Sequence, residues 1–81
     1  MNQTITFVVL VDNLHGNYEY KNVNVPITNL YNADPQNIQA TYNRNEEALD
    51  RYFDKHCRKQ GCIYLELGNP QKYPDPNALL D

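Results

Sequence analysis

The stretch from Asn45 to Gly61, NEEALDRYFDKHCRKQG, decides the fold because it carries helix signals along its whole length. Asn45 suits the N-cap position, and the two glutamates after it complement the positive end of a helix dipole. Gly61 can adopt the left-handed conformation that ends many helices. The sequence therefore predicts one helix between these residues.

One face of this helix is apolar. At ~100° per residue, six side chains fall on one side of the helix: Leu49, Tyr52, Phe53, His56, Cys57 and Gln60. Such a face must be covered, and the rest of the chain is expected to supply a sheet that covers it.

Two strands are expected before the helix. Thr4 to Val11 is dense in β-branched residues, and the turn formers of residues 12–17 follow it. Tyr18 to Ile27 reads as the antiparallel return strand, and Pro26 indicates an edge position or a bulge because proline donates no ladder hydrogen bond. A slip of register is expected near Lys21, where the phase of the preceding tyrosines is lost.

A further strand is expected after the helix, from Cys62 to Leu67. Its residues alternate, which predicts one buried face and one outer face. The expected buried residues are Ile63, Leu65 and Leu67, and the expected outer residues are Tyr64 and Glu66.

Residues 28–42 allow two interpretations. Asp34 and Pro35 form a good N-cap and N1 pair, which favours a short helix over Pro35 to Tyr42. Alternatively, Asn37 to Tyr42 forms a strand with Ile38, Ala40 and Tyr42 on one face. We favour the strand, because it leads directly into the main helix.

Together these elements predict a small α+β fold, in which an antiparallel sheet of three or four strands packs on one amphipathic helix. Residues 1–69 are expected to form this single domain. Residues 70–81 form a Pro-rich C-terminal tail that is extended or mobile, although Leu79 and Leu80 could dock it onto an apolar surface.

Composition narrows the classes of function. The 81-residue chain has a net charge of −3, which argues against a general DNA-coating protein. It contains no serine, so a serine nucleophile is excluded. Neither a leader peptide pattern nor an apolar run of membrane-spanning length is visible, so a cytoplasmic protein without membrane contact is expected.

Residues suited to metal binding or nucleophilic catalysis are few: His15, His56, Cys57 and Cys62. No two of them have the short spacing that forms half of a zinc site. Neighbouring helix residues do not face each other, so His56 and Cys57 form no dyad. We expect no metal, no cofactor and no enzymatic activity, and we expect reduced cysteines that serve in packing. A cysteine enzyme would need a thiol of lowered pKa.

A protein-binding surface is the preferred hypothesis. Acidic residues line one flank of the helix, and one helix covers only one face of a sheet, so the other face is expected to meet a partner protein or a second copy of the chain. Leu30, the C-terminal leucines or a short helix after Pro35 could instead cover that face, and both alternatives remain open. The residues proposed for partner binding are Glu46, Asp50, Asp54, Val8, Leu10 and Tyr64.

The function expected from this surface is that of an inhibitor or adaptor. One specific form is a protein of a phage or mobile element that blocks a host nucleic-acid enzyme, as an anti-defence protein does, by placing carboxylates where phosphates would bind. Replacing Glu46, Asp50 and Asp54 with alanine is then expected to weaken binding without unfolding the domain.

The alternative hypothesis is a small nucleic-acid-binding regulatory domain. Basic residues gather on the opposite flank of the helix, and tyrosines could add stacking faces. These basic residues are Arg44, Arg51, Lys55, Arg58 and Lys59. Cations near a helix C-terminus also complement the helix dipole, which is a purely structural explanation for them.

Overall fold

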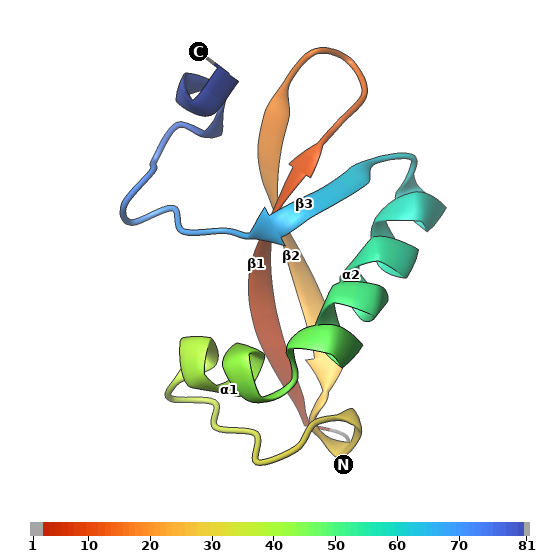
Figure 1. Ribbon diagram of the computed structural model, residues 1–81, viewed down its shortest axis with the longest axis vertical. Coiled ribbons are helices and arrows are strands. Elements are labelled where there is room, and N and C mark those ends of the chain that lie inside the picture. Colours follow the sequence, from red (N-terminus) through yellow and green to blue (C-terminus); the bar gives the residue numbers. More distant parts are fainter. Residues whose placement is uncertain (1–2, 81) are drawn as a thin grey trace.

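The central strand β1 (Thr4–Asp12) pairs antiparallel with β2 (Tyr18–Pro26) on one side and with β3 (Ile63–Leu67) on the other, which gives the strand order β2-β1-β3. The computed structural model describes residues 3–80, with the backbone alone for the last two. Two helices, α1 (Ile38–Arg44) and α2 (Glu46–Gln60), lie in one layer against the sheet, and short 3-10 turns cover Ile27–Asn29 (η1) and Pro76–Leu80 (η2) (Figure 1). This small α+β architecture is the predicted fold class.

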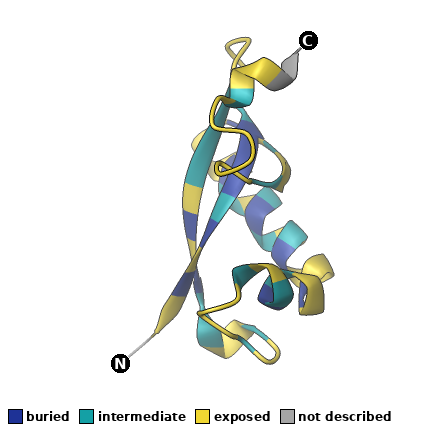
Figure 2. Cartoon of the chain, turned by 90° about the vertical axis from the view of Figure 1, so that its left-hand side faces the viewer, coloured by how far each residue is buried: buried dark blue, intermediate teal, exposed yellow. Residues whose placement is uncertain are grey.

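The main helix begins and ends where its sequence predicts. Asn45 is its N-cap residue, and Gly61 at its C-terminal end has the left-handed φ of 76°. Leu49, Phe53 and Cys57 are fully buried against the sheet, and the ring of Phe53 meets that of Phe7 edge-on at 5.5 Å between centroids. Figure 2 shows α2 lying against the strands, with buried segments along it in dark blue.

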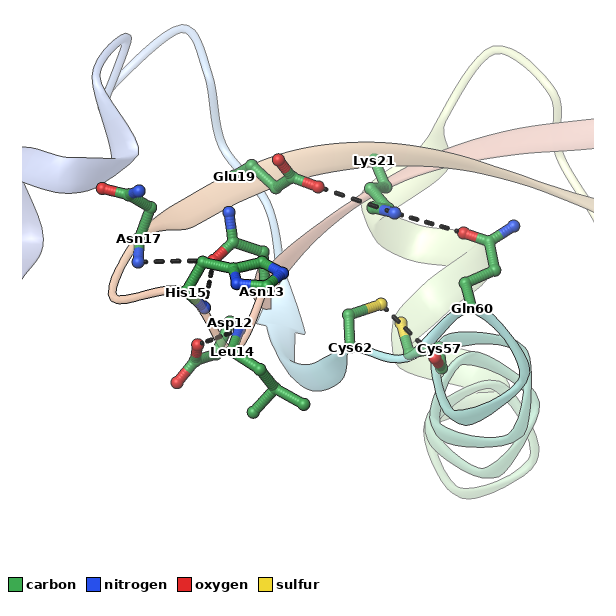
Figure 3. A network of polar contacts seen from close by, with 10 residues as sticks. All are labelled: Asp12, Asn13, Leu14, His15, Asn17, Glu19, Lys21, Cys57, Gln60 and Cys62. Atoms are coloured by element: carbon green, nitrogen blue, oxygen red, sulfur yellow. Dashed lines mark hydrogen bonds and ion pairs between the residues drawn. The ribbon is translucent and has the colours of Figure 1, made fainter.

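The core face of the hairpin follows simple alternation. In β1 every second residue from Ile5 to Val11 is buried, and Val23 and Val25 join them from β2. The register is continuous over the whole pairing, so the predicted slip near Lys21 is wrong. Lys21 lies on the core face near the end of α2, where its Nζ contacts Glu19 at 3.5 Å and Gln60 at 3.3 Å (Figure 3).

The irregularity lies in β3 instead. Leu10 is opposite Glu66 and Val11 is opposite Tyr64, so Leu65 has no partner across the pair and forms a bulge. The extra residue reverses the alternation between Tyr64 and Leu67, and both of these pack against the core. The predicted faces of this strand are therefore wrong in part: Ile63 and Leu65 are 47% and 42% exposed.

Residues 38–44 form a helix, so the preferred strand over Asn37 to Tyr42 is wrong. The side chain of Asn37 caps the helix by accepting from the backbone N–H of Ala40 at 3.1 Å. Ile38 and Tyr42 are four residues apart, so the helix also places both side chains against the core. Their spacing therefore fitted a helix face as well as a strand face.

The segment after β3 folds back onto the second face of the hairpin. Asn77 Oδ1 accepts from the backbone N–H of Tyr18 at 2.9 Å, and the hydroxyl of Tyr20 donates to the carbonyl of Tyr73. Gly68 lies directly against the ring of Tyr20, and Leu10 on this face is only 4% exposed. The end of the face that carries Leu10 is thus covered by the protein's own chain, which is the alternative that the sequence left open.

Leu30 and the short helix after Pro35 do not provide that covering. Leu30 and Ile38 pack on the core side of the sheet. The docking predicted for the side chains of Leu79 and Leu80 lies outside the described residues.

Candidate functional site

The N-terminal half of β1 has a neighbouring strand on one side only. β3 pairs with β1 from Val9 to Asp12, and beyond it the N–H of Gly68 donates to the carbonyl of Val8 at 2.8 Å. Between residues 3 and 80 no other strand lies beside Thr4–Phe7 on this side. The edge of the sheet is therefore open where β3 ends.

The direction of the backbone groups at this edge follows from the pairing. In an antiparallel strand, the N–H and C=O of one residue point to the same side, and those of the next residue point to the opposite side. Val8 points its carbonyl toward the β3 side, so Thr6, two residues away, points its N–H and C=O to the same side. These groups of Thr6 face the open edge.

A groove of about 570 Å³ lies along this open edge. Its walls come from three parts of the chain that are distant in sequence: Thr6 and Val8 of β1; Ile38, Gln39 and Tyr42 of α1; and residues 66–71, at the end of β3 and in the loop after it. In Figure 1, α1 and this loop lie on the same side of β1. The groove is therefore bounded by a strand edge, a helix and a loop.

The chemistry of the groove is mixed. Val8, Ile38 and Leu67 contribute half-buried apolar surface. Thr6 contributes main-chain donor and acceptor groups, and the carboxylate-bearing residue Glu66 lies exposed among the lining residues. Such a surface suits a ligand with apolar side chains and its own main-chain hydrogen-bonding groups.

Tyr42 is held in the groove wall by a polar cluster. Asp50 Oδ1 of α2 accepts from the hydroxyl of Tyr42 and from that of Tyr64, each at 2.8 Å. Burial, together with the Asp50 carboxylate, raises the pKa of both tyrosines above the ordinary value of 10.0. Both hydroxyls therefore stay protonated at neutral pH, and the cluster ties α1, α2 and β3 together.

Two of the three carboxylates on the acidic flank predicted for partner binding have partners within the chain. Glu46 is exposed, but Asp54 pairs with Arg58 at 3.1 Å. Asp50 uses one carboxylate oxygen for the two tyrosines described above. Changing Asp50 to alanine would therefore remove the acceptor of two tyrosine hydroxyls as well as one charge of the flank.

The apolar residues predicted for partner binding are separated in the structure. Val8 lines the groove, whereas Leu10 is buried on the covered end of its face. Tyr64 lies on the opposite face of the sheet, with its ring 5.3 Å from that of Phe53, so its predicted position beside the other two is wrong. The bulge at Leu65, which the alternating sequence did not reveal, is the physical reason.

The basic residues are also partly engaged. Arg44 donates to the carbonyl of Asn32 at 3.1 Å, and Arg58 is paired with Asp54. Arg51, Lys55 and Lys59 are exposed on α2. All five basic residues of the alternative nucleic-acid surface are therefore exposed, and two of them also have partners within the chain.

The two cysteines are buried and unbonded to each other (Figure 3). Burial, with a contribution from neighbouring Cys62, raises the pKa of the Cys57 thiol to about 12. Because a thiol nucleophile reacts as the thiolate, Cys57 lacks the lowered pKa that a cysteine enzyme would need. Within residues 3–80, no group of three or more His, Cys, Asp and Glu side chains is placed to hold a metal ion.

Several groove residues were missed by sequence reasoning, namely Thr6, Ile38, Gln39, Leu67 and Gly68. One available signal was the difference in length between two neighbouring strands. β1 has nine residues and β3 has five, because Gly68, Asn69 and Pro70 end β3 early. A shorter strand beside a longer one leaves part of the longer strand unpaired.

Comparisons of the chain with protein-family models, with curated proteins and with solved structures found no match. Within the described part of the chain, no helix has the length and apolar character needed to cross a membrane.

Proposed function

We propose that this protein is a small non-enzymatic binding module, an inhibitor or adaptor that engages another protein through the groove beside the unpaired half of β1. The observation that carries the proposal is the groove itself, which combines an open strand edge with the apolar side chains of Ile38 and Leu67. Strand edges and apolar clefts are recurrent sites of protein recognition.

The groove supports this function better than the acidic flank of α2 does. Asp50 and Asp54 already have partners within the chain, whereas Thr6 presents main-chain groups to an open edge. The net charge of −3 favours a partner with a basic surface. A host nucleic-acid enzyme blocked by a phage or mobile-element inhibitor is one partner of that kind.

Site-specific photo-crosslinking tests the proposal. A photoreactive amino acid replaces Gln39, which is exposed in α1 and lines the groove. The matched control replaces Lys59, which is exposed in the last turn of α2 and is not among the groove residues. On irradiation in the cells that make the protein, we expect a discrete covalent adduct with another protein from position 39 and none from position 59.

Two outcomes would contradict the proposal. Equal adducts from both positions would indicate non-specific contact. An adduct confined to position 59 and removed by nuclease would instead support the nucleic-acid alternative, which uses the exposed cations of α2.

A further inference from the structure

We infer that the groove binds an extended peptide segment of another protein by strand addition, with the segment lying beside Thr4–Phe7, where β3 no longer pairs with β1. This inference rests on the proposed function and adds to it the conformation and chemistry of the bound partner. The occupant would complete the third strand of the sheet over the half of β1 that β3 does not reach.

The main-chain groups of β1 set the first requirement. The N–H and C=O of Thr6 face the open edge, and the same alternation directs those of Thr4 toward it. An extended chain offers donors and acceptors at the matching spacing, which is how peptides add to exposed sheet edges. At ~3.3 Å per residue, the unpaired half of β1 accommodates roughly four residues of such a chain.

The side chains around the edge set the second requirement. Alternate residues of an added strand point to the two faces of the sheet. Those directed toward the helix layer would meet Ile38, Tyr42 and Leu67, so we expect an apolar residue at every second position. Glu66 among the lining residues and the net charge of −3 favour basic over acidic residues in the rest of the segment.

The shape of the groove favours a single chain over a second copy of this protein. The open edge lies between α1 and residues 68–71, both of which line the groove together with β1. A second copy would present the same recessed edge, so its helix and loop would meet those of the first before the two strands could pair. A lone extended segment needs only the ~4.8 Å spacing of neighbouring strands.

The probe for this inference is a phage-displayed library of random linear 12-residue peptides, selected on the full chain. The enriched peptide is synthesised, and its Kd is measured by fluorescence anisotropy. The peptide is then N-methylated at one position at a time. Strand addition predicts that methylation at alternate positions weakens binding by about tenfold or more, because each methyl group removes a main-chain hydrogen-bond donor and also blocks the strand edge.

A matched pair of proline variants tests the protein side. Thr6→Pro removes the N–H that faces the groove and is expected to weaken peptide binding by about tenfold or more. Asn22→Pro is the control, since Asn22 is opposite Val8 and its N–H faces away from β1 at the outer edge of β2. It is expected to leave the Kd unchanged. Thermal melts check that both variants fold. If Thr6→Pro does not fold, the N-methylated peptides test strand addition without it.

The outcomes separate this inference from the proposed function. One outcome would overturn strand addition and still leave the groove as a binding site. In that outcome, Ile38→Glu abolishes binding of the peptide, whereas N-methylation and Thr6→Pro do not change its Kd. A dimer in sedimentation that Thr6→Pro abolishes would identify a second copy as the occupant and overturn the inference. Failure to enrich any peptide would count against it too, while the adduct at position 39 tests the proposed function independently.

Discussion

At the residue scale, Asp50 has a role that its neighbours on the helix do not share. It belongs to a flank of acidic side chains, yet its Oδ1 accepts hydrogen bonds from two tyrosines on different elements. Tyr42 and Tyr64 are half-buried, so their hydroxyls need a partner within the protein. Asp50 is therefore a structural residue that also fixes one wall of the groove.

Asp50→Ala is expected to lower the free energy of unfolding by about 1–3 kcal/mol, because it leaves two half-buried hydroxyls without their acceptor. The matched control is Asp54→Ala, which removes a solvent-exposed ion pair and is expected to cost less than about 1 kcal/mol. Urea denaturation of both variants checks the difference. Equal costs would contradict the structural role of Asp50.

At the scale of elements, Asn45 joins the two helices to the loop before them. It separates α1 from α2 and is 9% exposed. Its side chain does not cap α2 but exchanges hydrogen bonds with the backbone N–H and C=O of Tyr31 and donates to the carbonyl of Thr41. A residue that the sequence assigns to helix capping therefore holds a loop 14 residues away.

Asn45→Ala is expected to cost about 2–3 kcal/mol of unfolding free energy, since three backbone groups in a part-buried setting lose their partner. Asn37→Ala removes the single capping bond of α1 at an exposed position and is expected to cost about 1 kcal/mol. Denaturation of the two variants under the same conditions checks this order. A larger cost for Asn37→Ala would show that local capping outweighs the loop contact.

At the scale of the whole molecule, the segment after β3 acts as the cover of the second sheet face. It is attached to β2 through Tyr18 and Tyr20, which are more than fifty residues away in sequence. These contacts join the segment to the hairpin, and within the described residues the segment itself contains only the short 3-10 turn η2. The tail is therefore part of the folded domain rather than a separate appendage.

Deletion of residues 72–81 is expected to lower the free energy of unfolding by about 2–3 kcal/mol, because it uncovers apolar surface around Leu10 and Tyr20. The truncated chain should also bind the dye ANS more strongly than the full chain. Tyr20→Phe is the control that keeps the cover and removes one hydrogen bond, with an expected cost of about 1 kcal/mol. Unchanged stability after truncation would mean that the tail does not hold the face closed.

The sequence alone determined the features whose signals are local. The stop of α2, most of its buried stripe and the hairpin of β1 and β2 depend on residues near one another in the chain, and the structure agrees with them. The helix at residues 38–44 also had a local cause, the Asn37 cap, but the spacing of Ile38 and Tyr42 suited a strand equally well.

Only the tertiary structure decided the features that join distant segments. The bulge at Leu65 arises from pairing with β1, and it turned Tyr64 toward α2 and placed its hydroxyl on Asp50. The groove exists because β3 leaves β1 at Gly68 while α1 lies beside the strand that remains unpaired. Hydrophobic spacing shows which residues tend to be buried, but it does not show which strand ends beside which helix, and that relative placement created the candidate site.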